Sequence, residues 1–104
     1  MARPDRGEVW LVDLGIAAKI RPCLILSVAP DPQDRVLITL VPHTTSLHGT
    51  RFEVSVPKSF LKVGAFDAQG LVTVALSRMV RRLGHLAPAE MALVEQAVRL
   101  WLGL

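Results

Sequence analysis

Short runs of apolar and β-branched residues follow one another along most of the chain, and turn-forming residues separate them. Runs of this kind, bounded by Gly, Pro and Asp, predict β-strands. We expect strands at residues 8–14, 20–28, 35–41, 50–56 and 71–76, with a short final strand within 79–86. Strands this short and this regularly spaced indicate a small, strongly bent sheet or barrel.

The period of the pattern changes near the C-terminus, where it becomes helical. Pro88 suits the first position of a helix and Gly103 suits a C-terminal stop. The apolar residues that share one predicted helix face are Met91, Val94, Val98, Trp101 and Leu102. Leu93 and Leu100 widen the apolar surface beyond that face, so we expect the helix to be covered on more than one side. The sequence therefore predicts a single domain over residues 1–104, mainly β with a C-terminal helix.

Composition adds an expectation about assembly and location. Hydrophobic residues make up 51% of the chain and the mean hydropathy is +0.41. No apolar run approaches the roughly 18 residues needed to span a membrane, and the charged N-terminus is not followed by the apolar core of a signal peptide. We therefore expect a cytoplasmic protein that does not enter the membrane. A subunit interface in a homodimer is the simplest place for the excess apolar surface.

Charge and metal-binding residue types narrow the function only slightly. The formal net charge of +3 and the pI of 9.8 favour polyanionic partners mildly. Cys23, the single cysteine, lies in an apolar run, which predicts a buried and unreactive thiol. His43, His48 and His85 lack the spacing of metal ligands, and His48 and His85 lie beside glycines in expected turns. We expect no metal site and no cofactor.

Arg21 is the first candidate for chemistry, because it lies at the start of an apolar strand where a buried charge is costly unless it is paired. It could form a structural salt bridge with Asp13 or Glu8, or lie solvated at the strand end. It could also bind an anion, since a guanidinium offers a planar fork of donors suited to phosphate.

A run of polar residues after the third expected strand offers complementary chemistry. We expect Pro42 to break that strand and to be followed by a loop that carries His43, Thr44, Thr45 and Ser46. Such hydroxyls usually bond to local backbone. If they meet Arg21, however, they form a metal-free site for a phosphodiester whose nucleophile is the 2′-hydroxyl of RNA. Such a site needs a proton acceptor, charge stabilisation and a donor for the leaving oxygen.

His43 is the acid–base candidate by residue type, although it could instead cap the loop. Arg78, Arg81 and Arg82 form a basic cluster, and Lys58, Lys62 and Arg51 add positive charge elsewhere in the chain. These residues fit either a solvated face or a groove for an RNA backbone.

Three segments in order resemble the MazF/PemK (Kid) toxins of bacterial toxin–antitoxin pairs: residues 6–14, 21–27 and 41–45. The resemblance extends over nearly the whole chain and implies a small SH3-like β-barrel (CcdB/MazF/PemK-like) that acts as a homodimer. It implies a metal-independent, sequence-selective endoribonuclease that cleaves single-stranded RNA and leaves a 2′,3′-cyclic phosphate. It also implies a cognate antitoxin with an acidic, flexible tail.

By position, the resemblance assigns Arg21 as the catalytic arginine and Thr44 as the catalytic threonine, with the adjacent Thr45 able to exchange roles with Thr44. Beside these and His43, we expect contacts to RNA from Lys19, Thr45, Ser46, Arg78 and Arg81.

One departure from the family leaves the proton acceptor open. Members commonly carry a longer loop before the Arg-Pro pair, with a Gly-x-Glu segment that has an acid–base role, whereas residues 15–20 contain no carboxylate.

Two alternatives to the nuclease remain. One is a small barrel that binds RNA or protein without catalysis. The other is a gyrase poison like CcdB, which acts through a terminal Trp-Gly-Ile; this chain ends at 101–104 in Trp-Leu-Gly-Leu.

Overall fold

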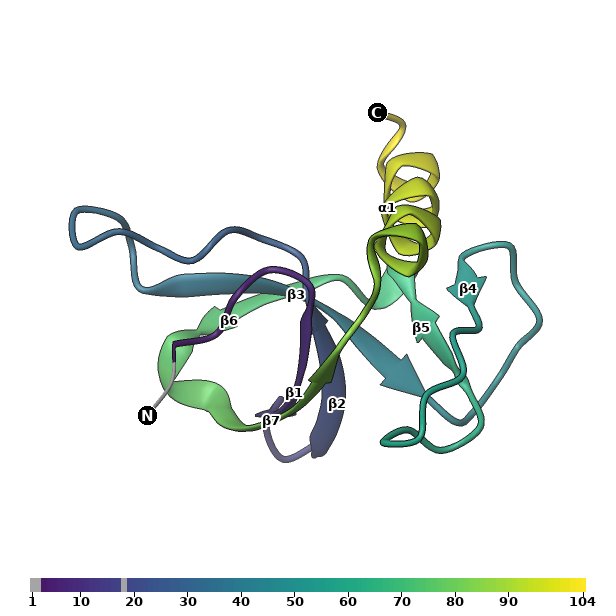
Figure 1. Ribbon diagram of the computed structural model, residues 1–104, viewed down its shortest axis with the longest axis horizontal. Coiled ribbons are helices and arrows are strands. Elements are labelled where there is room, and N and C mark those ends of the chain that lie inside the picture. Colours follow the sequence, from purple (N-terminus) through teal and green to yellow (C-terminus); the bar gives the residue numbers. More distant parts are fainter. Residues whose placement is uncertain (1–2, 18) are drawn as a thin grey trace.

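The computed structural model describes residues 3–17 and 19–104 and shows a small β-structure with one α-helix at its C-terminal end (Figure 1). Two 3-10 helices, η1 and η2, flank one of the strands. In chain order the elements are β1 (Glu8–Asp13), β2 (Ile20–Ile25), β3 (Leu37–Thr44), β4 (Glu53–Val54), β5 (Ala65–Asp67), η1 (Ala68–Gly70), β6 (Val72–Ala75), η2 (Leu76–Arg78), β7 (Met79–His85) and α1 (Pro88–Leu102).

The strands form one antiparallel sheet in the order β4-β5-β3-β2-β1-β7. β3 belongs to two ladders, because its residues 37–40 pair with β6 and its residues 43–44 pair with β5. A strand shared in this way bends the sheet into a barrel-like form that does not close between β4 and β7 (Figure 1). The fold class expected from the sequence, mainly β with a C-terminal helix in an SH3-like arrangement, is confirmed.

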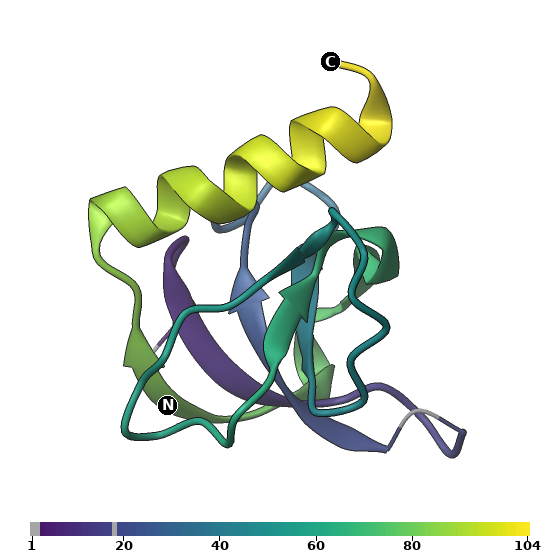
Figure 2. The same cartoon turned by 90° about the vertical axis from the view of Figure 1, so that its right-hand side faces the viewer.

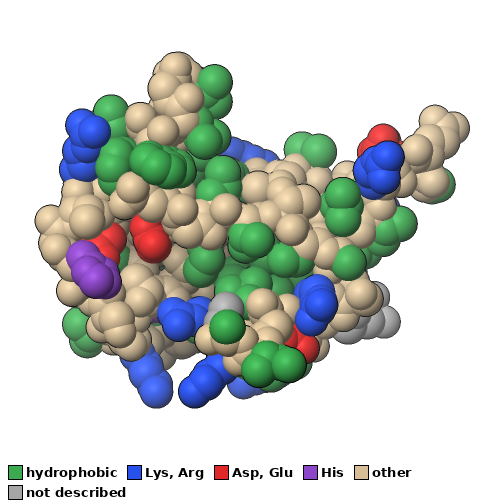
Figure 3. Space-filling model, turned by 180° about the vertical axis from the view of Figure 1, so that it is seen from behind, with side chains coloured by type: hydrophobic (Ala, Val, Ile, Leu, Met, Phe, Trp, Pro, Cys, Tyr) green, Lys and Arg blue, Asp and Glu red, His purple; other side chains and the backbone are tan. Residues whose placement is uncertain are grey.

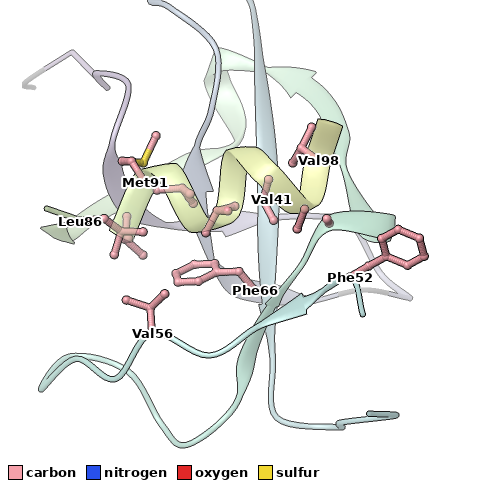
Figure 4. Packing of buried hydrophobic residues seen from close by; sticks show 12 residues of the cluster. Val41, Phe52, Val56, Phe66, Leu86, Met91 and Val98 are labelled. Atoms are coloured by element: carbon pink, nitrogen blue, oxygen red, sulfur yellow. The ribbon is translucent and has the colours of Figure 1, made fainter. Parts of the chain in front are cut away.

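The central strands of the sheet carry buried side chains on both faces, which explains why they read as nearly continuous apolar runs. Alternate residues of β1, β2 and β3 contribute to two separate clusters. Val9, Leu24 and Val41 belong to the cluster that packs under α1 (Figure 4). Their neighbours in the chain, Trp10, Cys23 and Leu40, lie on the other face. They form the second cluster together with residues of β6, η2 and β7. Cys23 is fully buried, as expected, and burial raises the pKa of its thiol to about 12.

Helix α1 lies across the curved sheet (Figure 2) and has the predicted bounds. Gly103 adopts a left-handed conformation with φ 72°, the usual way to end a helix at glycine. Of the residues expected on one helix face, Met91, Val94 and Val98 are buried, whereas Trp101 and Leu102 are 44% and 49% exposed in the single chain. Leu93 and Leu100 are also half exposed. Among the described residues, no helix is long and apolar enough to cross a membrane.

The strand boundaries differ from expectation around the polar run. β3 does not break at Pro42 but continues to Thr44, because Pro42 remains in register opposite Cys23 of β2. The strand expected over 50–56 is reduced to the two residues of β4, and β5 was not predicted. Residues 55–64 form turns and irregular backbone. This irregular segment leads into β5, which pairs with the end of β3.

Candidate functional site

Two cavities meet at Arg21. The larger, which we call the basic cavity, has a volume of about 690 Å³. Its lining residues are Leu11, Lys19, Ile20, Arg21, Pro22, His43, Thr45, Ser46, Phe60, Lys62, Arg81 and Leu83. The smaller, which we call the apolar cavity, has a volume of about 340 Å³. Its lining residues are Leu14, Arg21, Pro42, Thr44, Asp67, Gly70, Val72 and Val74. Arg21 is therefore the side chain common to both.

The position of Arg21 follows from strand alternation. It lies two residues before Cys23, so it shares a sheet face with the buried second cluster, but it sits at the exposed beginning of β2, opposite Val12 of β1. The two carboxylates that the sequence offered as partners for Arg21 form other ion pairs. Asp13 lies 3.9 Å from a guanidinium nitrogen of Arg78, and Glu8 lies 2.8 Å from Nε of Arg82.

The end of β3 distributes the predicted polar run between the two cavities. Because successive side chains of a strand point to opposite faces, His43 and Thr45 line the basic cavity, whereas Pro42 and Thr44 line the apolar one. The hydroxyl of Thr44 also accepts a hydrogen bond from the backbone N–H of Ser46 at 3.0 Å. Arg21 and Thr44 therefore both line the apolar cavity, whereas Arg21, His43 and Thr45 all line the basic cavity. This division depends on β3 continuing past Pro42.

His43 is the one buried polar or charged side chain among the described residues, with 5% of its surface exposed. Its ring packs edge-on against Phe66 at 5.1 Å between centroids. Burial lowers the pKa of this imidazole below its ordinary value, so the ring is neutral at pH 7 and one of its nitrogens can accept a proton. Gly64 makes the packing possible: a Cβ there would lie 2.8 Å from Cε1 of His43 and would overlap the Thr44 carbonyl oxygen.

Positive charge dominates the basic cavity. Lys19, Arg21, Lys62 and Arg81 line it, and no carboxylate is among the lining residues that the structure describes. Cationic walls with hydroxyls and no competing carboxylate attract an anionic backbone. The face in Figure 3 shows Lys and Arg side chains along its lower edge, below a region where hydrophobic side chains gather.

Most predicted site residues reach a cavity, with one exception. Lys19, Thr45, Ser46 and Arg81 line the basic cavity, whereas Arg78 lines neither cavity and pairs with Asp13. His48 and His85 are exposed, and neither lines either cavity. Within the described ranges, no group of three or more His, Cys, Asp and Glu side chains is close enough to hold a metal ion.

Sequence reasoning missed Phe60 as a site residue, and it named Lys62 only among the basic residues of a possible RNA-backbone groove. Both come from the irregular segment 55–64, whose composition carries no periodic signal. Phe60 packs on Gly84 of β7, where an added Cβ would lie 2.5 Å from the ring. The glycine before His85 was the only available sign that something packs closely there.

Comparison with known proteins agrees with this geometry. Residues 5–102 match the model of a family described as PemK-like, MazF-like toxin of type II toxin–antitoxin system. An endoribonuclease in complex with its cognate antitoxin, from a mycobacterial species, is 28% identical with a TM-score of 0.82, over 97% of this chain and 96% of that one. A second mycobacterial endoribonuclease is 27% identical with a TM-score of 0.80, over 100% and 95% of the two chains. MazF from Deinococcus radiodurans has the same fold, with a TM-score of 0.84 at 24% identity over the full length of both chains.

Proposed function

This chain belongs to the PemK-like, MazF-like toxins of type II toxin–antitoxin systems, and we propose that it is an endoribonuclease that cleaves single-stranded RNA without a metal ion. The observation that carries the proposal is the junction at Arg21, where a guanidinium, an imidazole and two threonine hydroxyls border connected surfaces. These groups supply what transesterification of RNA needs from a protein.

Arg21 binds the scissile phosphate and stabilises the charge that develops on its oxygens. A guanidinium is suited to this role because it stays protonated and presents several N–H donors in one plane. Donors already fixed toward a developing charge need no reorganisation during the reaction, which makes this the largest contribution in many enzymes.

His43 accepts the proton of the 2′-hydroxyl. Burial lowers its pKa, so the neutral, accepting form predominates at neutral pH. The 2′-oxygen then attacks phosphorus, the bond to the 5′-oxygen breaks, and the leaving 5′-oxygen takes up a proton from solvent. The products are a 2′,3′-cyclic phosphate and a 5′-hydroxyl. His43 thus serves as the proton acceptor, a role for which the loop at residues 15–20 offers no carboxylate.

The two threonines act on opposite sides of Arg21. Thr44 donates to the phosphate or to the leaving oxygen from the side of the apolar cavity, and Thr45 with Ser46 binds the backbone in the basic cavity. Lys19, Lys62 and Arg81 hold the RNA strand through its phosphates.

We further propose that the chain works in the cytoplasm as a homodimer and is neutralised by a cognate antitoxin. The half-exposed apolar residues of α1 supply surface for these contacts: Leu93, Leu100, Trp101 and Leu102. One of the similar mycobacterial endoribonucleases was solved in complex with its cognate antitoxin.

The test is incubation of the purified protein with a long single-stranded RNA in the presence of EDTA. We expect discrete fragments from the wild type and none from Arg21→Ala or Thr44→Ala. Arg35→Ala, in an exposed loop outside both cavities, is the matched control and should cleave normally. Fragments that persist in both site variants would refute the site, and binding without cleavage by the wild type would favour a non-catalytic module.

A further inference from the structure

The apolar cavity has the composition of a small-ligand site. Four hydrocarbon side chains form most of its wall: Leu14, Pro42, Val72 and Val74. Among the lining residues that the structure describes, three polar side chains join them, those of Arg21, Thr44 and Asp67. Its volume of about 340 Å³ is in the range of small-ligand sites, roughly 300–1,000 Å³, which combine apolar walls with a few convergent polar groups.

The position of Arg21 between the two cavities indicates what the apolar cavity binds. A phosphate bound at Arg21 carries one nucleotide on each side, and the basic cavity borders Arg21 with cations and hydroxyls suited to the backbone. The other surface that borders Arg21 is the apolar cavity. Proteins read single-stranded RNA by placing splayed bases on apolar or aromatic surfaces and by hydrogen-bonding to their edges.

We propose that the apolar cavity is a nucleobase subsite next to the scissile phosphate, and that Asp67 selects a base that presents an amino group there. The inference rests on the proposed ribonuclease function, and it adds a specificity residue to it.

The local geometry leaves one oxygen of Asp67 available. Oδ1 accepts a hydrogen bond from the backbone N–H of Gln69 at 3.1 Å, which fixes the side chain at the start of η1. At Gly70, an added Cβ would lie 3.3 Å from Oδ2 of Asp67 and 3.4 Å from Cγ of Pro42. The glycine therefore keeps open the space between the second carboxylate oxygen and an apolar wall of the cavity.

A carboxylate only accepts hydrogen bonds, so it discriminates between bases by their donors. Cytosine, adenine and guanine all present amino groups, whereas uracil presents a carbonyl oxygen at the position of the cytosine amino group. Uracil would place its O4 acceptor against the carboxylate at the position of the cytosine amino group, and its one ring donor, N3–H, lies beside that position. We therefore expect the subsite to disfavour uracil.

A purely structural role for Asp67, as the residue that caps η1, makes a different prediction. Asp67→Asn keeps a carbonyl oxygen that can accept from Gln69, but it replaces the second acceptor with an NH₂ donor. If Asp67 only caps η1, the substitution leaves base preference unchanged. If it reads the base, the preference for cytosine over uracil disappears or reverses.

The experiment compares oligonucleotides that carry cytosine, uracil or pyrimidin-2-one at each of the two positions flanking a cleavage site mapped with the wild type. At one position we expect kcat/KM to favour cytosine over uracil by about 10- to 100-fold, the effect of one hydrogen bond to a charged group. Pyrimidin-2-one, which lacks the amino group, should also be a poor substrate. Asp34→Asn is the control, because it makes the same charge change in an exposed turn and should keep the wild-type ratio.

The outcomes separate the subsite from the nuclease. Cleavage with equal rates for cytosine and uracil at both positions, or a ratio unchanged in Asp67→Asn, would refute the subsite and leave the nuclease. Absence of cleavage by the wild type would refute the nuclease. In that event, the dissociation constants of 2′-deoxy oligonucleotides with cytosine or uracil test the subsite directly, and equal values would overturn it.

Discussion

Replacement of His43 by glutamine tests the proposed chemistry most directly, because it removes the imidazole that we propose as the proton acceptor. Glutamine retains hydrogen-bonding capacity and similar bulk but cannot take up a proton near neutral pH. A positioned general base contributes about 10²- to 10⁴-fold to the rate. We therefore expect kcat to fall by that factor in His43→Gln.

The cost to folding must be separated from the cost to catalysis. The edge-on contact with Phe66, at 5.1 Å between ring centroids, contributes about 0.5–1.5 kcal/mol beyond burial. His43→Gln should therefore unfold at a lower temperature but remain folded at 25 °C. Thermal denaturation followed by circular dichroism measures this loss, and rates are compared only where both proteins are fully native.

The pH profile identifies the base more specifically than the rate does. Burial lowers the pKa of His43 below 6.5, so the acidic limb of kcat/KM for the wild type should lie below pH 6.5. In the RNA complex the neighbouring phosphate favours the imidazolium, so the acidic limb of kcat should lie at higher pH than that of kcat/KM. Both limbs should be absent from the residual activity of His43→Gln.

The same pKa shift predicts how folding stability depends on pH. Below pH 6.5 an unfolded chain protonates this histidine while the native chain does not. The free energy of unfolding contributed by His43 is therefore complete above pH 6.5 and is lost as the pH falls toward the native pKa. His48→Gln, at an exposed loop outside both cavities, is the control and should leave the acidic limb of kcat/KM unchanged. A near-normal rate in His43→Gln, or an unchanged acidic limb, would refute the assignment and leave His43 a packing role.

Three further predictions concern residues around the site. Gly64→Ala should lower the free energy of unfolding by about 1–3 kcal/mol, as overpacking does, because the added methyl group overlaps the Thr44 carbonyl oxygen. It should reduce activity as well. A melting temperature and a cleavage rate equal to those of the wild type would contradict the packing described. The Cys23 thiol, with its pKa raised to about 12, should react with iodoacetamide at pH 8 only after denaturation, and labelling of the native protein would contradict its burial. Arg81→Gln should reduce the slope of log K against log salt for single-stranded RNA by about 0.7, whereas Arg82→Gln, which removes a side chain paired with Glu8, should leave the slope unchanged.

The fold could be predicted because its signals are local. The apolar runs around Trp10 and Leu24, and the helix between Pro88 and Gly103, depend on side-chain period and on end residues that act within a few positions. β5 and the shortened β4 could not be predicted, because three- and two-residue strands have too little pattern to detect. Their pairing depends on β3 as a template rather than on their own propensity.

The candidate site was only partly predictable for the same reason. Residue chemistry and the resemblance pointed to Arg21 and Thr44, but not to Phe60, and they did not place Lys62 beside Arg21. Both residues reach the basic cavity on an irregular segment. The uninterrupted path of β3 through Pro42 was also hidden, since proline in a strand normally argues for its end.

The sequence by itself determined the class of fold, the ends of the helix and the residue types capable of acting on a phosphodiester, because each of these depends on neighbours in the chain. Only the tertiary structure decided that consecutive residues of β3 face different cavities and that Arg21 borders both. It also decided that His43 is buried and that its pKa is lowered, because desolvation depends on Phe66 and Gly64, which lie about twenty residues away in the sequence.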